Sequence, residues 1–297
     1  MTVILPSDHH ARQALIDRRI DCISQERAVR QDIRALRIGI LNIMPQAENY
    51  EYSVLFPLGR SVMQINPIWI KLKSHPYRSS SGTHLENLYI AFEEAVRERH
   101  LDALIVTGAP VEAIPFEEVT YWDEVCEILA YARQNIVSTL GICWGGLAMA
   151  KTLGIDKIQY EKKLFGVFPA KSLVTHHRII GECDDIFHIP QSRMAGIADE
   201  VLEAKRDEGS LDLLALSEPG GYTIFETRDK RFLMHLGHPE YDAGRLVVEY
   251  ERDKALGLEG VLPPENVDLG NPINVWRCNG LEFFSQWIKD AYERTPY

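Results

Sequence analysis

A cysteine between closely spaced glycines is the residue of this chain whose surroundings most favour chemistry. Cys143 lies in Gly141-Ile-Cys-Trp-Gly145, which follows an apolar run of strand length, Ile136 to Ile142, and precedes a helix-like run, Leu147 to Leu153. Small residues two positions to either side of Cys143 permit a sharp turn from strand to helix, as in a nucleophile elbow. The N-terminus of the following helix favours the reactive thiolate. The pattern therefore predicts a nucleophile, although a buried, inert cysteine also fits it.

A candidate base and its partner lie far downstream, in Gly237-His-Pro-Glu240. Thiol catalysis needs a base that takes and returns a proton, and a group that orients this base. His238 and Glu240 follow a predicted strand and offer these two side chains. A structural turn is the commoner explanation of His-Pro-Glu taken alone. His235, which precedes the pair, is predicted to pack within the sheet.

The composition is that of an ordinary globular chain and argues against several functions. The 297 residues are 45% hydrophobic and 25% charged, which is enough to build a full core. The net charge of -11 argues against a nucleic-acid-binding surface. No apolar run reaches membrane-spanning length, and the first residues lack the pattern of a signal peptide. We therefore expect a cytoplasmic protein that binds neither nucleic acid nor membrane.

The cysteines and histidines show no metal-binding or disulfide spacing. The five cysteines are scattered and odd in number, which does not fit a disulfide framework; they are Cys22, Cys126, Cys143, Cys183 and Cys278. Neither Cys-x-x-Cys nor His-x-x-x-His spacing occurs. We therefore predict no metal and no permanently bound cofactor.

Strands and helices alternate through the first half of the chain. Nearly continuous apolar runs predict buried parallel strands at 36–43, 65–72, 103–107 and 136–142. Helices are predicted between them at 52–63, 83–99 and 117–134, the second capped by Thr83. This alternation predicts an α/β fold with a doubly wound, mostly parallel sheet. Ligands bind such sheets at the carboxyl ends of the strands, where Met44-Pro45, Gly108-Ala-Pro110 and Cys143 would meet.

The second half is less regular. Short strands are predicted at 165–174 and 179–183, a hairpin at 222–227 and 231–236, and helices at 243–256 and 281–292. The polar residues 1–35 are expected to form an irregular arm with a short helix at 11–19. No repeat or low-complexity linker occurs. The chain is therefore predicted to form one domain over 1–297, with the arm 1–35 packed on it.

Taken together, these motifs resemble a known family. Gly-x-Cys-x-Gly and the later Gly-His-Pro-Glu are similar to motifs of the class I glutamine-amidotransferase-like (flavodoxin-like) fold, which implies a triad of Cys143, His238 and Glu240. More of the chain resembles the homoserine O-acyltransferases of methionine biosynthesis. The matching segments are Gln31-Asp-Ile-Arg34, Leu41-Asn-Ile-Met-Pro45, Thr107-Gly-Ala-Pro110, Tyr121-Trp122, Cys143-Trp144, Lys163-Leu-Phe-Gly-Val167, Asp184-Asp185, Ser192-Arg193, Gly237-His-Pro-Glu-Tyr-Asp242, Glu249-Tyr-Glu-Arg-Asp253 and Trp276-Arg277.

The resemblance implies a ping-pong acyltransferase. Cys143 would attack the thioester of an acyl-CoA and release CoA. His238, oriented by Glu240, would then deprotonate the acceptor hydroxyl, which attacks the acyl-enzyme. The backbone amide of Trp144 is a candidate oxyanion donor, with a second donor expected from the loop 108–111.

The resemblance also implies substrate-binding residues. By position in the motifs, Arg252 would pair with the amino-acid carboxylate, and Lys163 and Ser192 would line the substrate pocket. From the sequence alone, a surface ion pair, a solvated loop charge and a turn cap explain these three residues more simply. The resemblance leaves the binding site of the CoA phosphates open.

One residue bears on the acyl donor. At the second position after Thr107-Gly-Ala-Pro110, members of the family that use succinyl-CoA have glycine, and those that use acetyl-CoA have glutamate. This chain has Glu112, which implies acetyl-CoA as a substrate. A carboxylate there would repel the free carboxylate of a succinyl group by on the order of 4 kcal/mol, at about 4 Å and an effective dielectric constant of about 20. The alternative is a glutamate that faces solvent.

Three places depart from the family pattern and leave the acceptor open. Gln46 and Ala47 replace two lysines, Gln191 replaces a histidine, and Leu147 replaces a glutamine. L-homoserine is the expected acceptor, with L-serine of cysteine biosynthesis as the alternative, because one methylene is worth only roughly 1–3 kcal/mol in a pocket.

Two other classes of protein remain as alternatives. A glutamine amidotransferase domain and a non-catalytic binding protein can both be built on the same fold. The oligomeric state is open as well. Phe283, Phe284 and Trp287, if exposed on their helix, would support a homodimer.

Overall fold

The computed structural model describes residues 2–98, 100–258 and 260–296. These residues form a 12-stranded sheet in the order β2-β1-β4-β3-β6-β7-β12-β11-β10-β8-β9, with β5 beside β4. The strands are β1 Thr2–Ile4, β2 Asp21–Ile23, β3 Leu36–Leu41, β4 Gln64–Lys71, β5 Ile90–Ala91, β6 Ala103–Val106, β7 Ser138–Ile142, β8 Ile158–Ser172, β9 Ile186–Gly196, β10 Leu211–Ser217, β11 Gly221–Thr227 and β12 Phe232–His235.

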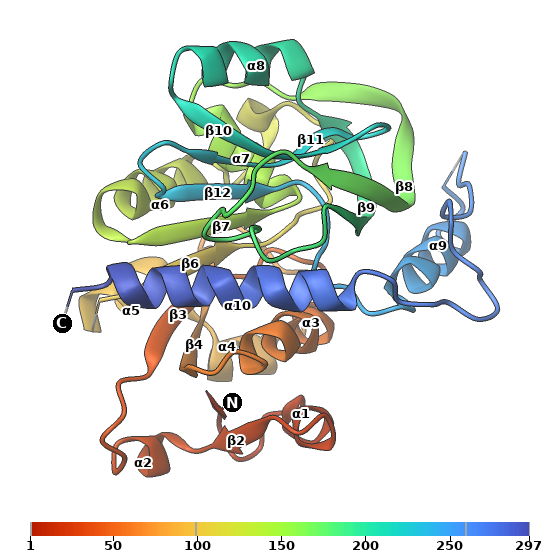
Figure 1. Cartoon of the computed structure of the whole chain (residues 1–297). Helices are drawn as coiled ribbons and strands as arrows, with labels where there is room; N and C mark the ends of the chain where they lie inside the picture. The colour runs from red at the N-terminus through yellow and green to blue at the C-terminus, as the bar shows by residue number, and fades with distance from the viewer. Residues whose placement is uncertain (1, 99, 259, 297) are drawn as a thin grey trace.

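The helices connect and cover these strands. They are α1 Arg12–Asp17, α2 Gln25–Ala28, α3 Ala47–Gly59, α4 Gly82–Leu88, α5 Phe92–Glu98, α6 Trp122–Asn135, α7 Trp144–Thr152, α8 Asp199–Asp207, α9 Arg245–Ala255 and α10 Arg277–Arg294, with a 3₁₀ helix at Phe116–Glu118. Figure 1 shows α10 crossing in front of the sheet, with α6 and α7 behind it. None of the helices in the described part of the chain combines the length and apolar character needed to span a bilayer.

The sheet is parallel in one half and antiparallel in the other. From β2 across to β12, the neighbouring strands along the sheet run parallel. From β12 to β9, each neighbouring pair is antiparallel. The prediction of a doubly wound, mostly parallel α/β sheet is confirmed, and the predicted hairpin is β11–β12.

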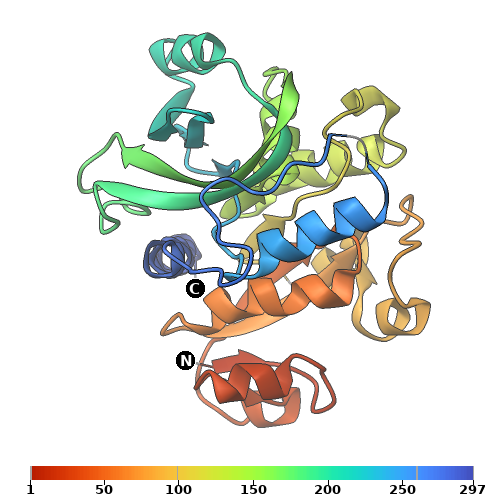
Figure 2. The same ribbon diagram turned by 90° about the vertical axis from the view of Figure 1, so that its right-hand side faces the viewer.

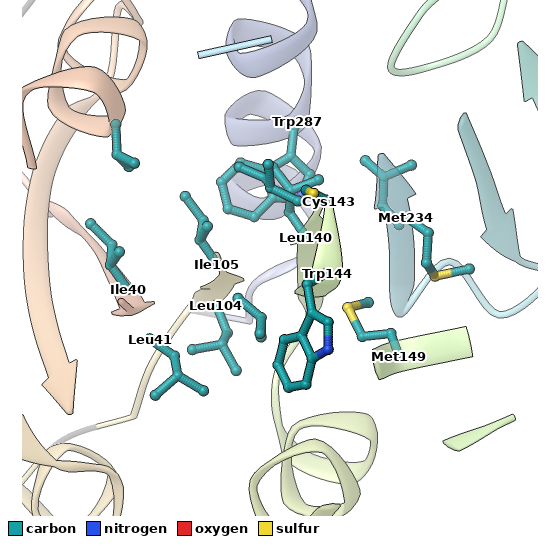
Figure 3. Packing of buried hydrophobic residues seen from close by; sticks show 14 of the residues in the cluster. Ile40, Leu41, Leu104, Ile105, Leu140, Cys143, Trp144, Met149, Met234 and Trp287 are labelled. Atoms are coloured by element: carbon teal, nitrogen blue, oxygen red, sulfur yellow. The ribbon is translucent and has the colours of Figure 1, made fainter. Parts of the chain in front are cut away.

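Burial explains why the central strands are apolar runs. Every residue of β6 and β7 is buried, because helices cover both faces of a parallel sheet. Figure 3 shows Trp144 and Trp287 on opposite sides of β7. The Trp287 indole N–H donates to Ser138 Oγ at 2.9 Å and so ties α10 to this strand.

The N-terminal arm is more regular than expected. β1 pairs in parallel with both β2 and β4, so the arm extends the sheet, and the expectation of an irregular arm was wrong. Val3, Ile4 and Ile23 are buried there, but three-residue strands are too short to give a periodic pattern. Figure 2 shows the arm at one end of the molecule, next to α3.

The helix predicted at 83–99 is broken into two. Tyr89 has extended backbone angles and ends α4, and its buried hydroxyl donates to Glu51 at 2.8 Å. Ser81, and not Thr83, caps α4 by accepting from the His84 N–H at 3.4 Å. The predicted end of this helix at Arg99 lies outside the described residues.

Two expectations for the second half were wrong. Residues 179–183 form turns, and the strand that follows is β9. Phe283, Phe284 and Trp287 are 2%, 0% and 0% exposed. They pack into the core, so the surface argument for a homodimer loses its basis.

Candidate active site

The backbone around Cys143 makes the sharp turn that the glycine spacing predicts. Cys143 lies between β7 and α7 with φ 52° and ψ −115°, a left-handed φ that non-glycine residues rarely adopt. A Cβ on Gly145 would lie 2.2 Å from the Val106 carbonyl oxygen, and one on Gly141 would lie 2.7 Å from the Gly145 carbonyl carbon. Only glycine fits at either position, and the turn sets the sulfur at the carboxyl edge of the sheet.

His238 reaches the same edge because its strand neighbours the cysteine's strand. β12 pairs in parallel with β7, with His235 opposite Ile142. An ideal Cβ built on Gly108 would lie 3.5 Å from Cys143 Cβ and 3.6 Å from His238 Cε1. The structure therefore brings the cysteine and the imidazole together beside the Gly108 loop.

Two groups fix the orientation of the His238 ring. Its Nδ1 is 2.8 Å from Glu240 Oε1, and the ring stacks on Tyr241 with 4.0 Å between centroids. The same Glu240 oxygen accepts a hydrogen bond of 2.7 Å from the Tyr50 hydroxyl on α3. No sequence motif points to Tyr50, which is fully buried.

Burial and charge act in opposite directions on the pair. Burial would lower the pKa of His238, but the Glu240 carboxylate and the Cys143 sulfur raise that pKa well above its usual value. Burial raises the pKa of the Cys143 thiol, against the attraction of His238. The two groups interact strongly enough to titrate as one unit.

Glu112 lies directly at the sulfur. Its Oε1 is 3.5 Å from Cys143 Sγ. The Nζ of Lys157 donates to the carbonyls of Glu112 and Ile114, both at 2.5 Å, and holds the loop in place. Burial raises the pKa of Glu112. The alternative of a solvent-facing glutamate is wrong.

Residues of β9 and α9 form a further part of the sulfur's surroundings. The Ser192 carbonyl oxygen is 3.9 Å from Cys143 Sγ, and the Ser192 hydroxyl donates to Glu249 at 2.6 Å. Glu249 also accepts from the Tyr241 hydroxyl at 2.6 Å. Burial would raise the pKa of Glu249, but the charges of His238 and Lys163 hold it below its usual value.

Two predicted binding residues meet on a carboxylate. Lys163 Nζ lies 3.1 Å from Asp253 Oδ2, and an Arg252 guanidinium nitrogen lies 2.7 Å from Asp253 Oδ1. The Arg252 side chain is 43% exposed. Sequence reasoning named Glu249 and Asp253 only as parts of a motif, because a helix with alternating charges usually indicates a solvated face.

The departures from the family pattern are mostly packing positions. Ala47 and Gln191 are fully buried, and Leu147 is 1% exposed. Gln191 accepts a hydrogen bond of 2.9 Å from the buried Arg193 guanidinium. Gln46 is exposed and adopts a left-handed conformation before α3. Three of the four departures thus occupy buried positions in this chain, and only Gln46 faces solvent.

The amide of Trp144 lies at the start of the helix that follows Cys143. Trp144 is the first residue of α7, so its N–H has no partner within the helix. The indole packs on Phe116 and Trp122, with centroid distances of 6.0 and 6.4 Å. This packing joins the helix start to the loop that carries Glu112.

Solved structures define the class of fold. A glutamine amidotransferase from Methylobacillus flagellatus superimposes with a TM-score of 0.55 at 14% identity, over 90% of this chain and 98% of its own. A glutamine amidotransferase from Thermotoga maritima superimposes with a TM-score of 0.54 at 13% identity, over 88% of this chain and 98% of its own. The fold is therefore that of the class I glutamine amidotransferases.

Sequence comparisons define the family. The sequence model of the family described as homoserine O-succinyltransferase matches residues 2–297 of this chain. Homoserine O-acetyltransferase of Geobacillus kaustophilus is 38% identical over 100% of this chain and 99% of its own. Homoserine O-acetyltransferase of Bacillus subtilis is 35% identical over 100% of this chain and 99% of its own. The chain belongs to the homoserine O-succinyltransferase family and is an acyltransferase.

Proposed function

We propose that this chain transfers the acetyl group of acetyl-CoA to the side-chain hydroxyl of L-homoserine, a step of methionine biosynthesis, through a thioester on Cys143. The observation that carries the proposal is the surroundings of the sulfur. The His238–Glu240 pair lies beside the thiol, and Glu112 lies 3.5 Å from it. Family membership and the names of the relatives support homoserine as the acceptor.

The first half-reaction acylates Cys143. Glu240 holds His238 Nδ1, which leaves Nε2 to take the proton of the Cys143 thiol. The thiolate attacks the thioester carbonyl, and the Trp144 amide and the loop 108–111 stabilise the oxyanion. CoA leaves as a thiolate, takes the proton from His238, and departs as the free thiol.

The second half-reaction transfers the acyl group from Cys143 to the acceptor. His238 takes the proton of the acceptor hydroxyl, and the oxygen attacks the carbonyl of the Cys143 thioester. The bond from sulfur to the acyl carbon breaks, and the proton on His238 returns to the sulfur. The product is an oxygen ester, so the step from thioester to ester runs downhill.

Glu112 supports acetyl-CoA as the donor. An acyl group on Cys143 Sγ would extend beside the carboxylate 3.5 Å away. A succinyl group would bring a second carboxylate, repelled by on the order of 4 kcal/mol. That figure is an upper one, because burial raises the pKa of Glu112 and weakens its charge. An acetyl group carries no charge and is not repelled.

The charged residues across the site suit an amino acid. Its ammonium group needs a carboxylate, and its carboxylate needs a cation. Glu249 and Asp253 supply carboxylates, while Lys163 and Arg252 supply cations. We expect Arg252 to exchange Asp253 for the substrate carboxylate, since a guanidinium pairs with a carboxylate through two hydrogen bonds. Ser192 sits between the sulfur and Glu249 and lines the acceptor side.

Intact-protein mass spectrometry tests the proposal. The protein mixed with acetyl-CoA should gain the mass of one acetyl group, and Cys143→Ala should gain none. Addition of L-homoserine should remove the acetyl group and yield O-acetylhomoserine. A protein that gains no mass, but releases ammonia from glutamine, would be an amidotransferase and would overturn the proposal.

Competition assays test the choice of substrates. We expect acetyl-CoA to be used faster than succinyl-CoA, and Glu112→Gly to raise the relative rate with succinyl-CoA. L-homoserine should compete better than L-serine for the acetyl-enzyme. Faster acetylation of serine would replace the acceptor but leave the thioester mechanism standing.

A further inference from the structure

A second cluster of titratable side chains lies away from Cys143, where the N-terminal arm meets α3. His9 and His10 precede α1, and Glu51 lies on α3. One ligand atom from each of these three side chains lies within 4.8 Å of the others. His9 Nε2 is 3.2 Å, and His10 Nδ1 is 3.6 Å, from Glu51 Oε2. The proposed acyl transfer does not use these residues.

The two oxygens of Glu51 have different surroundings. Oε1 lies 2.7 Å from His84 Nε2 and accepts from the Tyr89 hydroxyl at 2.8 Å. Oε2 and His9 Nε2 are buried and face each other at 3.2 Å, and neither has a further hydrogen-bond partner in the described part of the chain. The side chains of Glu51 and His9 are 0% and 1% exposed. A cation held by both atoms would satisfy the carboxylate oxygen and the ring nitrogen together.

We propose that His9, His10 and Glu51 bind one divalent transition-metal ion of the zinc class. The ligand atoms are His9 Nε2, His10 Nδ1 and Glu51 Oε2. Imidazole nitrogen and carboxylate oxygen are ligands that zinc prefers, and three protein ligands leave a fourth tetrahedral position for water. The His10 side chain is 44% exposed, so solvent reaches that position.

Outer hydrogen bonds prepare two of the ligands. His10 Nε2 lies 2.9 Å from the Glu48 carbonyl oxygen, a contact that keeps the proton on Nε2 and leaves the Nδ1 lone pair free for the metal. His84 and Tyr89 hold the other oxygen of Glu51 and so direct Oε2 toward the histidines.

Metal binding requires two local adjustments. The Ala11 N–H donates to His9 Nδ1 at 3.2 Å, which assigns the His9 proton to Nε2 in the metal-free protein. A metal on Nε2 needs the other neutral tautomer, with this proton on Nδ1, so the Ala11 N–H must give up its bond to Nδ1. The His9 and His10 rings are stacked with 20° between their planes. The exposed His10 ring must therefore turn so that both ring planes contain the ion.

The ion would fasten the arm to the helix that supports the catalytic carboxylate. Glu51 follows Tyr50, whose hydroxyl donates to Glu240 at 2.7 Å. The metal site thus uses Glu51 of α3, and the triad is supported by its neighbour Tyr50. The sequence patterns predicted no metal here because the ligands come from separate elements.

Titration with Co²⁺ tests the proposal directly. The full chain is purified without a polyhistidine tag, treated with chelator and desalted. We expect visible absorption bands that saturate at one Co²⁺ per chain and disappear when Zn²⁺ displaces it. Zn²⁺ should also raise the midpoint of thermal unfolding. If Co²⁺ gives no saturable bands and Zn²⁺ leaves the midpoint unchanged, the proposal is wrong.

A matched pair of variants separates the site from other histidines. His10→Gln removes an exposed ligand and should not disturb folding. It is expected to weaken binding by at least the roughly 10- to 100-fold that loss of an outer partner costs. His188→Gln, which removes an exposed imidazole on β9, should bind as the unchanged chain does. Equal affinity of His10→Gln and the unchanged chain would overturn the assignment.

Discussion

The two sides of the sulfur are built in different ways. On the elbow side, Cys143, His238 and Glu240 are 2%, 2% and 5% exposed, and strand register and turn geometry fix them. On the acceptor side, the side chains of Lys163 and Arg252 are 28% and 43% exposed and are held by ion pairs. In the proposed mechanism, backbone geometry would position the groups that transfer protons, and ion pairs that can exchange partners would hold the groups that bind the substrate.

The difference matters because the two tasks need different freedom. A proton transfer requires donor and acceptor within hydrogen-bond reach, and the parallel pairing of β12 with β7 sets that distance. Recognition of an amino acid requires charges that can leave their resting partners. Asp253 accepts from both Lys163 and Arg252, so a substrate carboxylate can replace it on either cation. We therefore expect changes on the elbow side to act on kcat and changes on the acceptor side to act on KM.

Removal of the nucleophile should give the largest effect. Cys143→Ala is expected to lower kcat for acyl transfer by on the order of 10⁶-fold, as loss of a triad nucleophile does elsewhere. The check is steady-state release of CoA, measured with the far-UV circular dichroism of the variant as a control for folding. Residual activity within about 100-fold of the unchanged chain would mean that the acyl group does not pass through Cys143.

Loss of the Glu240 carboxylate, which contacts His238, should give the second-largest effect. Glu240→Gln keeps the shape of the side chain but removes the charge that raises the pKa of His238. We expect kcat to fall by about 10³- to 10⁴-fold, with KM for homoserine nearly unchanged.

Tyr50→Phe is the graded control for this carboxylate. It removes one hydrogen bond to Glu240 and leaves the charge in place. About 10-fold loss is expected. If both variants raised KM and left kcat intact, the proposed division between the two sides would fail.

The elbow side was also the predictable side, and the reason is physical. Glycine spacing around Cys143 and the buried runs of β3, β6 and β7 are local signals, because neighbouring residues determine the turn and the strands. Tyr50 contacts Glu240 across 190 positions, and Ser192 contacts Glu249 across 57. Such contacts leave no periodic trace in the sequence. The fold and the turn at Cys143 were therefore predictable from patterns, His238 and Glu240 were assigned to a triad through the family resemblance, and Tyr50 required coordinates.

Other structural features that the sequence did not predict also depend on contacts between distant segments. The short strand β1 pairs with the edge of β4, and β2 pairs with β1, so both strands depend on a neighbour and not only on their own sequence. Tyr89 ends α4 to reach Glu51, which lies in another element. Arg252 was predicted from its motif, but only the structure shows that Asp253 is its resting partner.

A change on the acceptor side should act mainly on binding. Lys163→Met removes the ammonium group that pairs with Asp253 and keeps much of the chain that covers the Phe165 ring. We expect KM for the amino acid to rise by roughly 10- to 100-fold, as loss of a charge-assisted hydrogen bond suggests, with kcat changed much less. Acetylation of Cys143 by acetyl-CoA should proceed at the unchanged rate. A slower acetylation step would place Lys163 on the elbow side of the comparison.

The smallest effect concerns a histidine near the triad that does not take part in it. Burial lowers the pKa of His235 to about 3, whereas Glu240 holds the pKa of its buried neighbour His238 high. In the unfolded chain His235 has a pKa of about 6.5. The unfolded state therefore binds more protons between these values, and the free energy of unfolding falls as pH falls below about 6.5, by up to about 1.4 kcal/mol per pH unit.

The variant His235→Asn isolates this contribution. Its side-chain oxygen can accept from the Gly237 N–H, as His235 Nδ1 does at 3.1 Å, but it does not titrate. Urea unfolding at several values between about pH 4.5 and 6.5 should show a shallower loss of stability in the variant. Equal slopes would mean that protonated His235 is accommodated in the folded chain. The sheet near the elbow would then be more open to solvent than the buried triad requires, and the contrast between a rigid elbow side and an exchangeable acceptor side would weaken.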